Sequence, residues 1–166
     1  MDDAEVNAEV DEEVRVRIAA PPARVWELIG DPTRMGEWSP ECQRVTWAGG
    51  GDAPQLGAKF KGHNQLGWRR WTTTGTIVAF EPEHEIGWDV DFAGFAIARW
   101  DYRIEAEAGG ASCTVVESFH DLRNRAFRVL GPAARGVRDT AAHNRVGMEQ
   151  TLARVKAAAE SASSNA

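Results

Sequence analysis

The strongest constraint on the fold is a long stretch, residues 41–121, in which short strand-like runs alternate with turn signals and no helix-length pattern intervenes. Glycine and proline mark the turns, because these residues adopt the backbone conformations that end a strand. The turn signals fall at residues 49–52, 66–67, 81–83, 93–94 and 109–110. Strands that are joined by short turns pair as antiparallel neighbours. The stretch therefore predicts an antiparallel sheet of consecutive strands.

Two neighbouring segments of this stretch define a pairing register. Apolar residues alternate with mostly charged ones in both, and the apolar members are Ile86, Trp88, Val90 and Phe92 in one segment and Ala98, Trp100, Tyr102 and Ile104 in the next. Directly opposed residues share a face of the sheet. A three-residue loop over residues 93–95 then places Trp88 opposite Trp100 and Asp89 opposite Arg99. We expect one face to be aromatic and the other to be a charged, solvated outer face.

A further strand and three helical segments flank this stretch. Apolar and polar residues alternate over residues 13–18, which predicts a half-buried strand. Pro21-Pro22 opens a short helix, and a second short helical segment covers residues 32–38. A longer helix is predicted from near Pro132 to about Glu160, because apolar residues recur there at helical spacing. Its apolar stripe consists of Val137, Ala141, Asn144, Met148, Leu152, Val155 and Ala159. A helix of about 25 residues is about 38 Å long, which is enough to span the sheet.

A strand, two short helices, about six antiparallel strands and a long amphipathic helix make the order of the helix-grip architecture. The opening residues 18–29, followed by Asp31-Pro32 and by residues 38–40, resemble those of the START-like superfamily. More closely, they resemble the bacterial polyketide cyclase/dehydrase and lipid-transport family, the SRPBCC group. Glu81-Pro82 before residues 86–88 is similar to its mid-sheet turn and strand, and Asn144, Gly147-Met148 and Thr151-Leu152 are similar to its last helix. The resemblance covers about residues 12–160.

The resemblance implies an α+β helix-grip (START-like) fold. In this family a curved antiparallel sheet of about seven strands, two short helices and a long C-terminal helix enclose a cavity. Members bind lipids, sterols, polyketides or other apolar molecules, some cyclise or dehydrate polyketides, and some act on other proteins. Fold alone does not choose among these functions. The family has no universal catalytic signature, so the resemblance transfers no catalytic residue to this chain.

Length and charge indicate one nearly neutral domain. A chain of 166 residues favours a single domain. The first 13 residues hold seven of the 25 acidic residues and no base, so the rest of the chain is close to neutral despite the net charge of −6. We interpret residues 1–12 as a flexible acidic tail, residues 13–160 as the ligand-binding domain and residues 161–166 as a disordered tail. Nothing in this charge pattern favours nucleic acid as a partner.

Other features bear on the compartment. Cys42 and Cys113 form neither a disulfide framework nor a CxxC pair, which suits a reducing compartment. No apolar run approaches the ~18 residues of a membrane span, and the N-terminus lacks a signal-peptide pattern. We therefore expect a cytoplasmic protein, and both monomer and homodimer remain open.

Aromatic residues are the main candidates for the walls of a ligand pocket, because such pockets are mostly apolar. The chain has seven tryptophans and one tyrosine, and large aromatic side chains are costly to leave in water. The pocket candidates are Trp38, Phe60, Trp71, Trp88, Phe92, Trp100, Tyr102, His120, Asn144, Met148 and Leu152. The alternative for any single one of them is ordinary core packing.

Polar residues in these patterns raise separate alternatives. Asn144 lies at the centre of the apolar stripe, and leaving a buried amide unpaired costs about 1–3 kcal/mol. Its partner is either a ligand or cavity water, or a neighbouring strand or loop. His120 and Glu117 are candidate acid/base groups, of which strand alternation allows only one to face the pocket. The angular position of His143 on the helix instead predicts an exposed pair with Asp139.

The segment of residues 123–138 is rich in arginine and contains no acid. Arginine near a helix N-terminus is electrostatically unfavourable, which suggests that function retains it there. One hypothesis is a gate that makes transient contact with an anionic headgroup, a carrier-protein phosphate or a membrane surface. The gate candidates are Arg125, Phe127, Arg128 and Leu130. The alternative is a solvated basic connection.

The remaining motifs exclude several functions. The four histidines show neither HExxH nor another ligand spacing, so no metal site is predicted. There is no GxSxG motif, no P-loop and no dinucleotide motif, and no cofactor is implied.

Three candidate functions are compatible with these patterns, in order of preference. The first is a carrier or sensor of a small hydrophobic, lipid-like or polyketide-like molecule. The second is an aromatase/cyclase-type enzyme, and the third is a protein-interaction module with a filled core.

Overall fold

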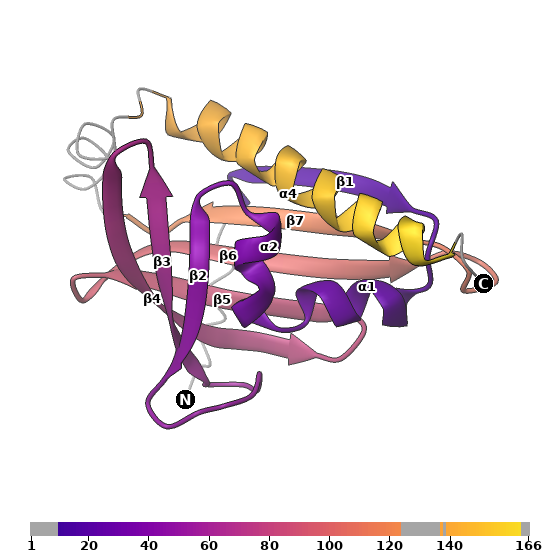
Figure 1. Cartoon of the computed structure of the whole chain (residues 1–166), viewed down its shortest axis with the longest axis horizontal. Coiled ribbons are helices and arrows are strands. Elements are labelled where there is room, and N and C mark those ends of the chain that lie inside the picture. Colours follow the sequence, from indigo (N-terminus) through magenta and orange to yellow (C-terminus); the bar gives the residue numbers. More distant parts are fainter. Residues whose placement is uncertain (1–9, 124–136, 138, 164–166) are drawn as a thin grey trace, which may run out of the picture.

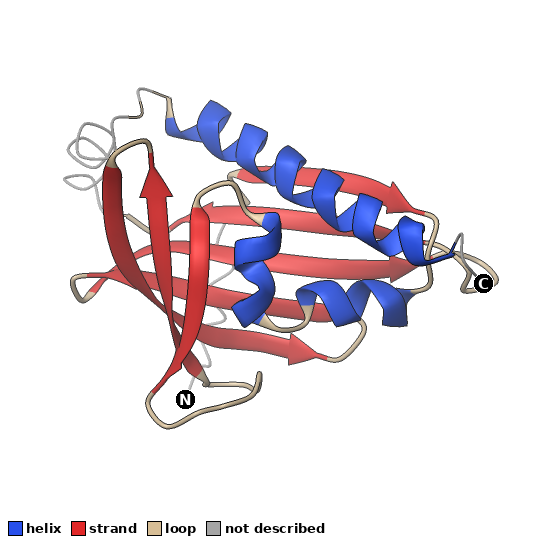
Figure 2. Ribbon diagram, viewed as in Figure 1, coloured by secondary structure: helices blue, strands red, loops and turns tan. Residues whose placement is uncertain are grey.

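The computed structural model describes residues 10–123, 137 and 139–163, and within them seven strands form one antiparallel sheet that curves beneath helix α4 (Figures 1 and 2). The elements are β1 (Glu12–Ile18), α1 (Pro22–Ile29), the 3-10 helix η1 (Pro32–Arg34), α2 (Met35–Trp38), β2 (Cys42–Ala48), β3 (Lys59–Leu66), β4 (Arg69–Glu81), β5 (Glu85–Phe92), β6 (Phe95–Ala106), β7 (Cys113–Asp121) and α4 (Thr140–Ser163). The architecture is an α+β helix-grip fold, as the resemblance implied.

The strand order explains how the sheet grips the helix. The strands run β1-β7-β6-β5-β4-β3-β2, so the consecutive strands β2 to β7 are neighbours and β1 closes the far edge beside β7. The helices α1 and α2 connect β1 to β2 across one face of the sheet (Figure 1). On the same face α4 runs along β1 and also contacts β7, α1 and α2. The space between α4 and the strands away from β1 is thus available for a cavity.

The predicted register of β5 and β6 is confirmed, but the predicted loop is wrong. Trp88 pairs with Trp100 and Asp89 with Arg99. Only Ala93 and Gly94 separate the two strands, and both have positive φ, as a tight hairpin turn with right-handed strand twist requires. The pairing contains a β-bulge after Val90, and this bulge accommodates within the strands the one extra residue that the prediction places in the loop.

The prediction of a solvated outer face is wrong at its centre. Asp101 is only 8% exposed and accepts hydrogen bonds from Arg99 at 3.0–3.1 Å. His120 on β7 lies 3.2 Å from the same carboxylate. Gly87, opposite Asp101 on β5, has no side chain, and an added Cβ there would lie 2.1 Å from the carboxylate oxygen. Asp101 is therefore buried between Arg99 and His120 on this face, which is not a fully solvated ladder.

A densely packed core occupies the end of the molecule where α1 and the second half of α4 meet the sheet. Its fully buried members include Ile18, Val25, Ile29, Leu152, Val155 and Ala159. Trp38 belongs to this packing, because its indole N–H donates to the carbonyl of Leu28 at 2.8 Å and Arg34 stacks on its ring. These buried side chains close the fold at this end.

The first strand and the last helix each extend slightly beyond the residues predicted for them. Strand β1 begins at Glu12, and the Asp11 carboxylate accepts a hydrogen bond from the backbone N–H of Asp121. Helix α4 continues to Ser163, beyond the predicted end near Glu160. No helix in the described part of the chain is both long and apolar enough to cross a membrane.

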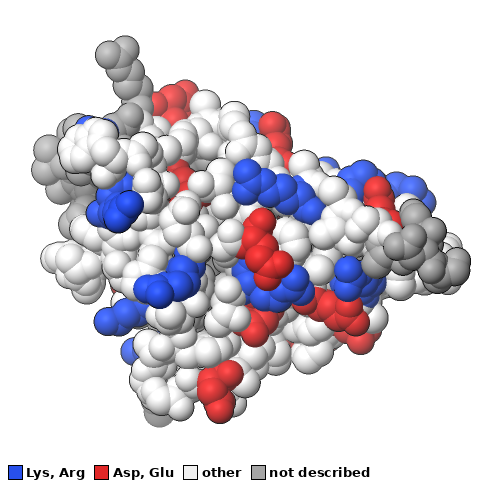
Figure 3. Space-filling model, in the orientation of Figure 1, with Lys and Arg blue, Asp and Glu red and all other residues white. Residues whose placement is uncertain are grey.

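Charged side chains of both signs cover the helices. Ion pairs join Arg24 to Glu27, Arg34 to Glu37 and Lys156 to Glu160. On the face shown in Figure 3, basic and acidic side chains accordingly lie side by side over α1, α2 and α4. The charge of this face is therefore mixed, as expected from the nearly neutral composition of the domain.

Candidate ligand-binding cavity

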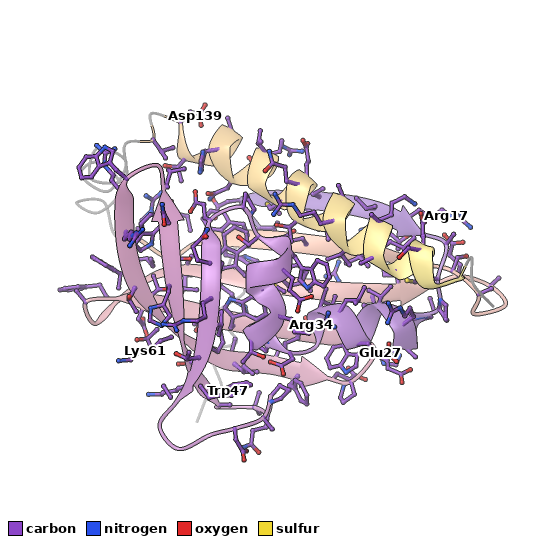
Figure 4. All side chains as sticks on the ribbon, viewed as in Figure 1. Arg17, Glu27, Arg34, Trp47, Lys61 and Asp139 are labelled. Atoms are coloured by element: carbon purple, nitrogen blue, oxygen red, sulfur yellow. The ribbon has the colours of Figure 1, made fainter. Side chains whose placement is uncertain are left out.

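A cavity of about 870 Å³ lies between the sheet and the first half of α4. Side chains of β2 to β7, the segment from Met35 to Cys42 and the α4 residues 140–151 line it. The turn between β3 and β4, the β5–β6 hairpin and the start of α4, next to Asp139, lie at the same end of the molecule (Figures 1 and 4). These three elements contribute lining residues, so we place the mouth of the cavity at this end.

Aromatic rings form a continuous wall of the cavity. Phe60 and Trp88 meet edge to face at a centroid distance of 5.8 Å, and Trp88 stacks on Tyr102 at 5.5 Å. Trp100 packs against Phe119 at 4.8 Å. The register creates this wall, because paired residues share a face and the inner face carries Trp88 on β5, Trp100 and Tyr102 on β6 and Phe119 on β7.

Phe60 occupies its place in the wall because the facing residue on β4 is Gly75. An alanine at position 75 would place its Cβ 2.2 Å from the ring of Phe60. The ring cannot easily move aside, since Trp47 and Trp88 pack against it. We expect Gly75→Ala to destabilise the fold by about 1–3 kcal/mol, measured from the midpoint of urea unfolding.

Gly51→Ala is the matched control for this prediction. Gly51 lies in a turn, and the nearest atom to an added Cβ is 3.8 Å away. Its unfolding midpoint should stay close to that of the unsubstituted chain. Equal midpoints for Gly75→Ala and Gly51→Ala would contradict the tight contact between Phe60 and position 75.

A buried, hydrogen-bonded pair of a carboxyl group and a tyrosine hydroxyl lies in the cavity wall. Glu117 on β7 is only 2% exposed, and its Oε1 accepts a hydrogen bond of 2.6 Å from the hydroxyl of Tyr102, the directly opposed residue on β6. Its Oε2 is buried and has no partner among the described residues. Burial raises the pKa of Glu117 to about 8, although the Tyr102 hydroxyl opposes the shift. Burial and the neighbouring Glu117 also raise the pKa of Tyr102. Glu117 is therefore a carboxyl group that stays protonated near neutral pH.

Asn144 and Thr151 contribute the buried polar groups of α4 to the cavity. The Thr151 hydroxyl donates to the carbonyl of Gly147 at 2.9 Å within the helix. Asn144 is 7% exposed, and its amide makes no hydrogen bond to any described residue. Of the two alternatives for Asn144, bonding to a neighbouring strand or loop is therefore not observed in the described part of the chain.

The mouth of the cavity combines apolar and charged side chains. Trp68, in the β3–β4 turn, is 81% exposed, and the Arg69 guanidinium stacks 4.6 Å from the centre of its ring. His143 contacts the carboxylate of Glu41 across the mouth. The predicted exposed pair of His143 with Asp139 is wrong, because α4 directs His143 toward the start of β2. This Glu41–His143 contact joins the helix to the sheet beside the opening.

Most of the predicted pocket residues lie at the cavity. Those that line it are Phe60, Trp71, Trp88, Phe92, Trp100, Tyr102, Asn144 and Met148. Trp38, His120 and Leu152 do not. Trp38 packs against α1, His120 belongs to the outer ion-pair cluster, and Leu152 lies one helical turn beyond Met148 in the closed core. Whether the lining residues contact a ligand stays a prediction.

The gate candidates Arg125, Phe127, Arg128 and Leu130 lie outside the described residues. Arg123, at the start of that segment, lines the cavity and forms an ion pair of 2.7 Å with Asp121. The proposed contact of residues 123–138 with a membrane or carrier protein therefore stays a prediction. Among the residues that the structure describes, no group of His, Cys, Asp or Glu side chains is arranged to hold a metal ion.

Glu117 is the residue that sequence reasoning considered but did not select. Strand alternation showed that either Glu117 or His120 faces the cavity, without deciding which. The deciding signal was present in β7, where Val115, Glu117 and Phe119 share one face and Ser118 and His120 share the other. An acid between two large apolar neighbours on the inner face indicates a buried carboxyl group.

Comparisons with known proteins agree with this geometry. The sequence model of the family described as polyketide cyclase / dehydrase and lipid transport matches residues 9–160. No curated protein matches the chain. The solution structure of a polyketide-cyclase-like protein from Corynebacterium glutamicum is similar, with 27% identity, a TM-score of 0.55 and coverage of 87% of this chain and 88% of the other.

Two more distant structures share the fold. A protein from Nitrosomonas europaea has 12% identity and a TM-score of 0.65, with coverage of 95% of this chain and 99% of the other. The major latex-like protein 151 of Panax ginseng has 14% identity and a TM-score of 0.63, with coverage of 89% and 95%. At these identities the likeness concerns the fold alone.

Proposed function

The chain belongs to the polyketide cyclase / dehydrase and lipid transport family, and from this premise we propose that it binds one small hydrophobic molecule as a carrier or sensor. The observation that carries the proposal is the cavity of about 870 Å³ with its wall of aromatic rings. Cavities of roughly 300–1,000 Å³ with mostly apolar walls and few polar groups are typical of small-molecule sites. The same cavity counts against the interaction module, because that hypothesis requires a filled core.

Native mass spectrometry of the purified chain, followed by organic extraction, tests the proposal directly. A stoichiometric adduct that extracts into organic solvent would support a carrier or an enzyme and would identify the ligand class. A mass that stays that of the free chain after incubation with fatty acids, sterols and aromatic polyketides would contradict the proposal.

Blocking the cavity from α4 should abolish ligand binding. Gly147 lines the cavity, and among the described residues the nearest atom to an added Cβ is in Pro40, at 3.8 Å. We expect Gly147→Phe to place a ring in the cavity and to weaken binding of the neutral fluorescent probe N-phenyl-1-naphthylamine at least tenfold. Fluorescence titration of the probe measures this effect.

Gly147→Ala is the matched control for the blocking variant. The methyl group has room, and alanine at an interior helix position is favoured over glycine by about 0.5–1 kcal/mol. The control should therefore bind the probe like the unsubstituted chain and unfold at a slightly higher temperature. Undiminished probe binding by a folded Gly147→Phe would show that the probe binds elsewhere.

An aromatase/cyclase-type enzyme is the second candidate, and Glu117 is the observation that favours it. A buried carboxyl group with a pKa near 8 and a tyrosine hydroxyl at 2.6 Å can exchange a proton with a bound ligand at neutral pH. Incubation with a linear poly-β-carbonyl compound, with loss of water followed by mass spectrometry, tests this function. An enzyme would lose turnover in Glu117→Gln, whereas a carrier shows no turnover in either form.

We also propose a cytoplasmic location and transient contact with a membrane or carrier protein. Cys42 and Cys113 are both free thiols, which supports a reducing compartment. The exposed Trp68, Phe92 and Val146 beside the cavity mouth, together with Arg69, support contact with an apolar and anionic surface. Monomer and homodimer both remain compatible with this proposal.

A further inference from the structure

We infer that the ligand is an apolar molecule that bears an uncharged carbonyl group, and that this group accepts a hydrogen bond from Glu117. The inference rests on the proposed binding function and narrows its ligand class. It assigns Glu117 as a specificity-determining residue of this cavity.

The hydrogen bonds of the buried polar side chains in the cavity carry the argument. Tyr102 donates to Oε1 of Glu117, and Thr151 donates to the carbonyl of Gly147. Both of these hydroxyl groups are thus occupied within the protein. Oε2 of Glu117 is buried and has no partner among the described residues. Buried polar groups are nearly always hydrogen-bonded in folded proteins, so this unpaired oxygen in the cavity wall indicates that a bound molecule completes it.

The position of the proton decides which kind of ligand group fits. Oε1 already accepts the Tyr102 hydrogen bond, so the proton of the neutral carboxyl group is placed on Oε2. Oε2 is then a donor, and its complement is an acceptor such as a ketone, ester or amide oxygen. A ligand carboxylate would instead have to leave water as a charged group and enter a mostly apolar cavity, and burying a charge costs more free energy than a single hydrogen bond returns.

The surroundings of Glu117 keep it neutral. The other titratable or charged side chains that line the cavity are Tyr102 on β6, Glu41 and Cys42 at the start of β2, Arg69 and Arg70 on β4, Arg123 after β7 and His143 on α4. Each basic side chain has another contact: Arg69 stacks on Trp68, Arg70 bonds to Gln65, Arg123 pairs with Asp121 and His143 contacts Glu41. Burial raises the pKa of Cys42 to about 11, and that of Tyr102 is raised as well. Between pH 7 and 9.5, therefore, we expect titration of Glu117 to control the polarity of this part of the cavity.

Three ligands with one ring system and similar size test the inference. They are 2-acetylnaphthalene, with a neutral carbonyl, 2-isopropylnaphthalene, with no acceptor, and 2-naphthoate, with a carboxylate. Binding is measured by quenching of tryptophan fluorescence, because Trp71, Trp88 and Trp100 line the cavity. At pH 7 we expect 2-acetylnaphthalene to bind several-fold more tightly than the isopropyl compound and at least tenfold more tightly than the carboxylate.

The pH dependence and two variants identify the donor. Since only the protonated carboxyl group donates, the affinity for 2-acetylnaphthalene should fall up to about thirtyfold between pH 7 and 9.5, as a pKa near 8 implies. Glu117→Gln keeps an acceptor for Tyr102 and a donor toward the ligand, so it should retain the preference for the carbonyl and lose the pH dependence. Glu117→Leu should lose both.

The outcomes separate this inference from the proposed function. If none of the three compounds binds, the proposed binding function fails. If all three bind with equal affinity at every pH, the binding function stands and the carbonyl inference is overturned. It is also overturned if the pH dependence persists in Glu117→Gln, a variant that preserves the shape of the side chain and is therefore expected to fold even if Glu117→Leu does not.

Discussion

Replacing Glu117 with glutamine is expected to stabilise the fold at alkaline pH, by on the order of 2–4 kcal/mol near pH 9. The ordinary pKa of a glutamate is 4.5, and burial raises that of Glu117 to about 8. Between these values the native state holds a proton that the unfolded chain has released. The free energy of unfolding therefore falls as the pH rises from about 4.5 to about 8, by at most roughly 1.4 kcal/mol per pH unit. Glutamine carries no charge at any pH and lacks this loss.

Thermal unfolding of both proteins from pH 5 to pH 9 measures the effect. The two melting temperatures should be similar near pH 5 and should separate as the pH rises, with Glu117→Gln the more stable. A constant difference across this range would contradict a neutral, buried Glu117.

Glu37→Gln is a control with the opposite sign. The ion pair with Arg34 lowers the pKa of Glu37, so this carboxylate stabilises the native state above its unfolded pKa and loses that contribution as the pH falls. Glu37→Gln should therefore be slightly less stable than the unsubstituted chain at pH 7, with a difference that vanishes in acid. Solvent screens the pair, so the effect is small.

Truncating Leu152 to alanine is expected to cost about 2–5 kcal/mol of stability without changing ligand binding. Leu152 is fully buried in the closed core where α1 and β1 meet α4, so its removal leaves a new void that the surrounding side chains fill only in part. Urea unfolding measures the loss of stability, and titration with N-phenyl-1-naphthylamine measures binding.

Met148→Ala is the matched variant one helical turn earlier. Met148 is equally buried but borders the cavity, so its truncation enlarges a space that already exists. We expect it to destabilise the fold as well and to change the affinity for the probe, in contrast to Leu152→Ala. The same change in probe affinity for both variants would show that the cavity extends into the region described as closed core.

The elements of this fold follow from local patterns. Alternation in β5 and β6 predicted which residues face inward and that Trp88 opposes Trp100, because side chains of a strand alternate and paired residues share a face. The same pattern did not predict the bulge after Val90. A bulge depends on the twist of the whole sheet. A hairpin without a bulge but with a loop one residue longer would pair Trp88 with Trp100 in the same way.

The candidate site was predictable only in part. Alternation placed Glu117 and His120 on opposite faces of β7, but which face encloses a cavity depends on the side of the sheet on which α4 packs. The charged outer ladder was assigned to solvent, whereas Asp101 is buried with Arg99 and His120 on that face. The burial of Glu117 could thus be inferred from its apolar neighbours in β7, whereas its place in the wall of a cavity became evident only from the assembled sheet.

The sequence by itself determined the order of the elements, the register of the central hairpin and the inward face of α4, because each depends on residues close together in the chain. Only the tertiary structure decided where the core ends and the cavity begins. Met148 and Leu152 occupy the same stripe of α4, yet one borders the cavity and the other is enclosed by α1 and β1. The difference arises from the space left where the sheet curves away from the helix, and this space depends on contacts between segments that are distant in the chain.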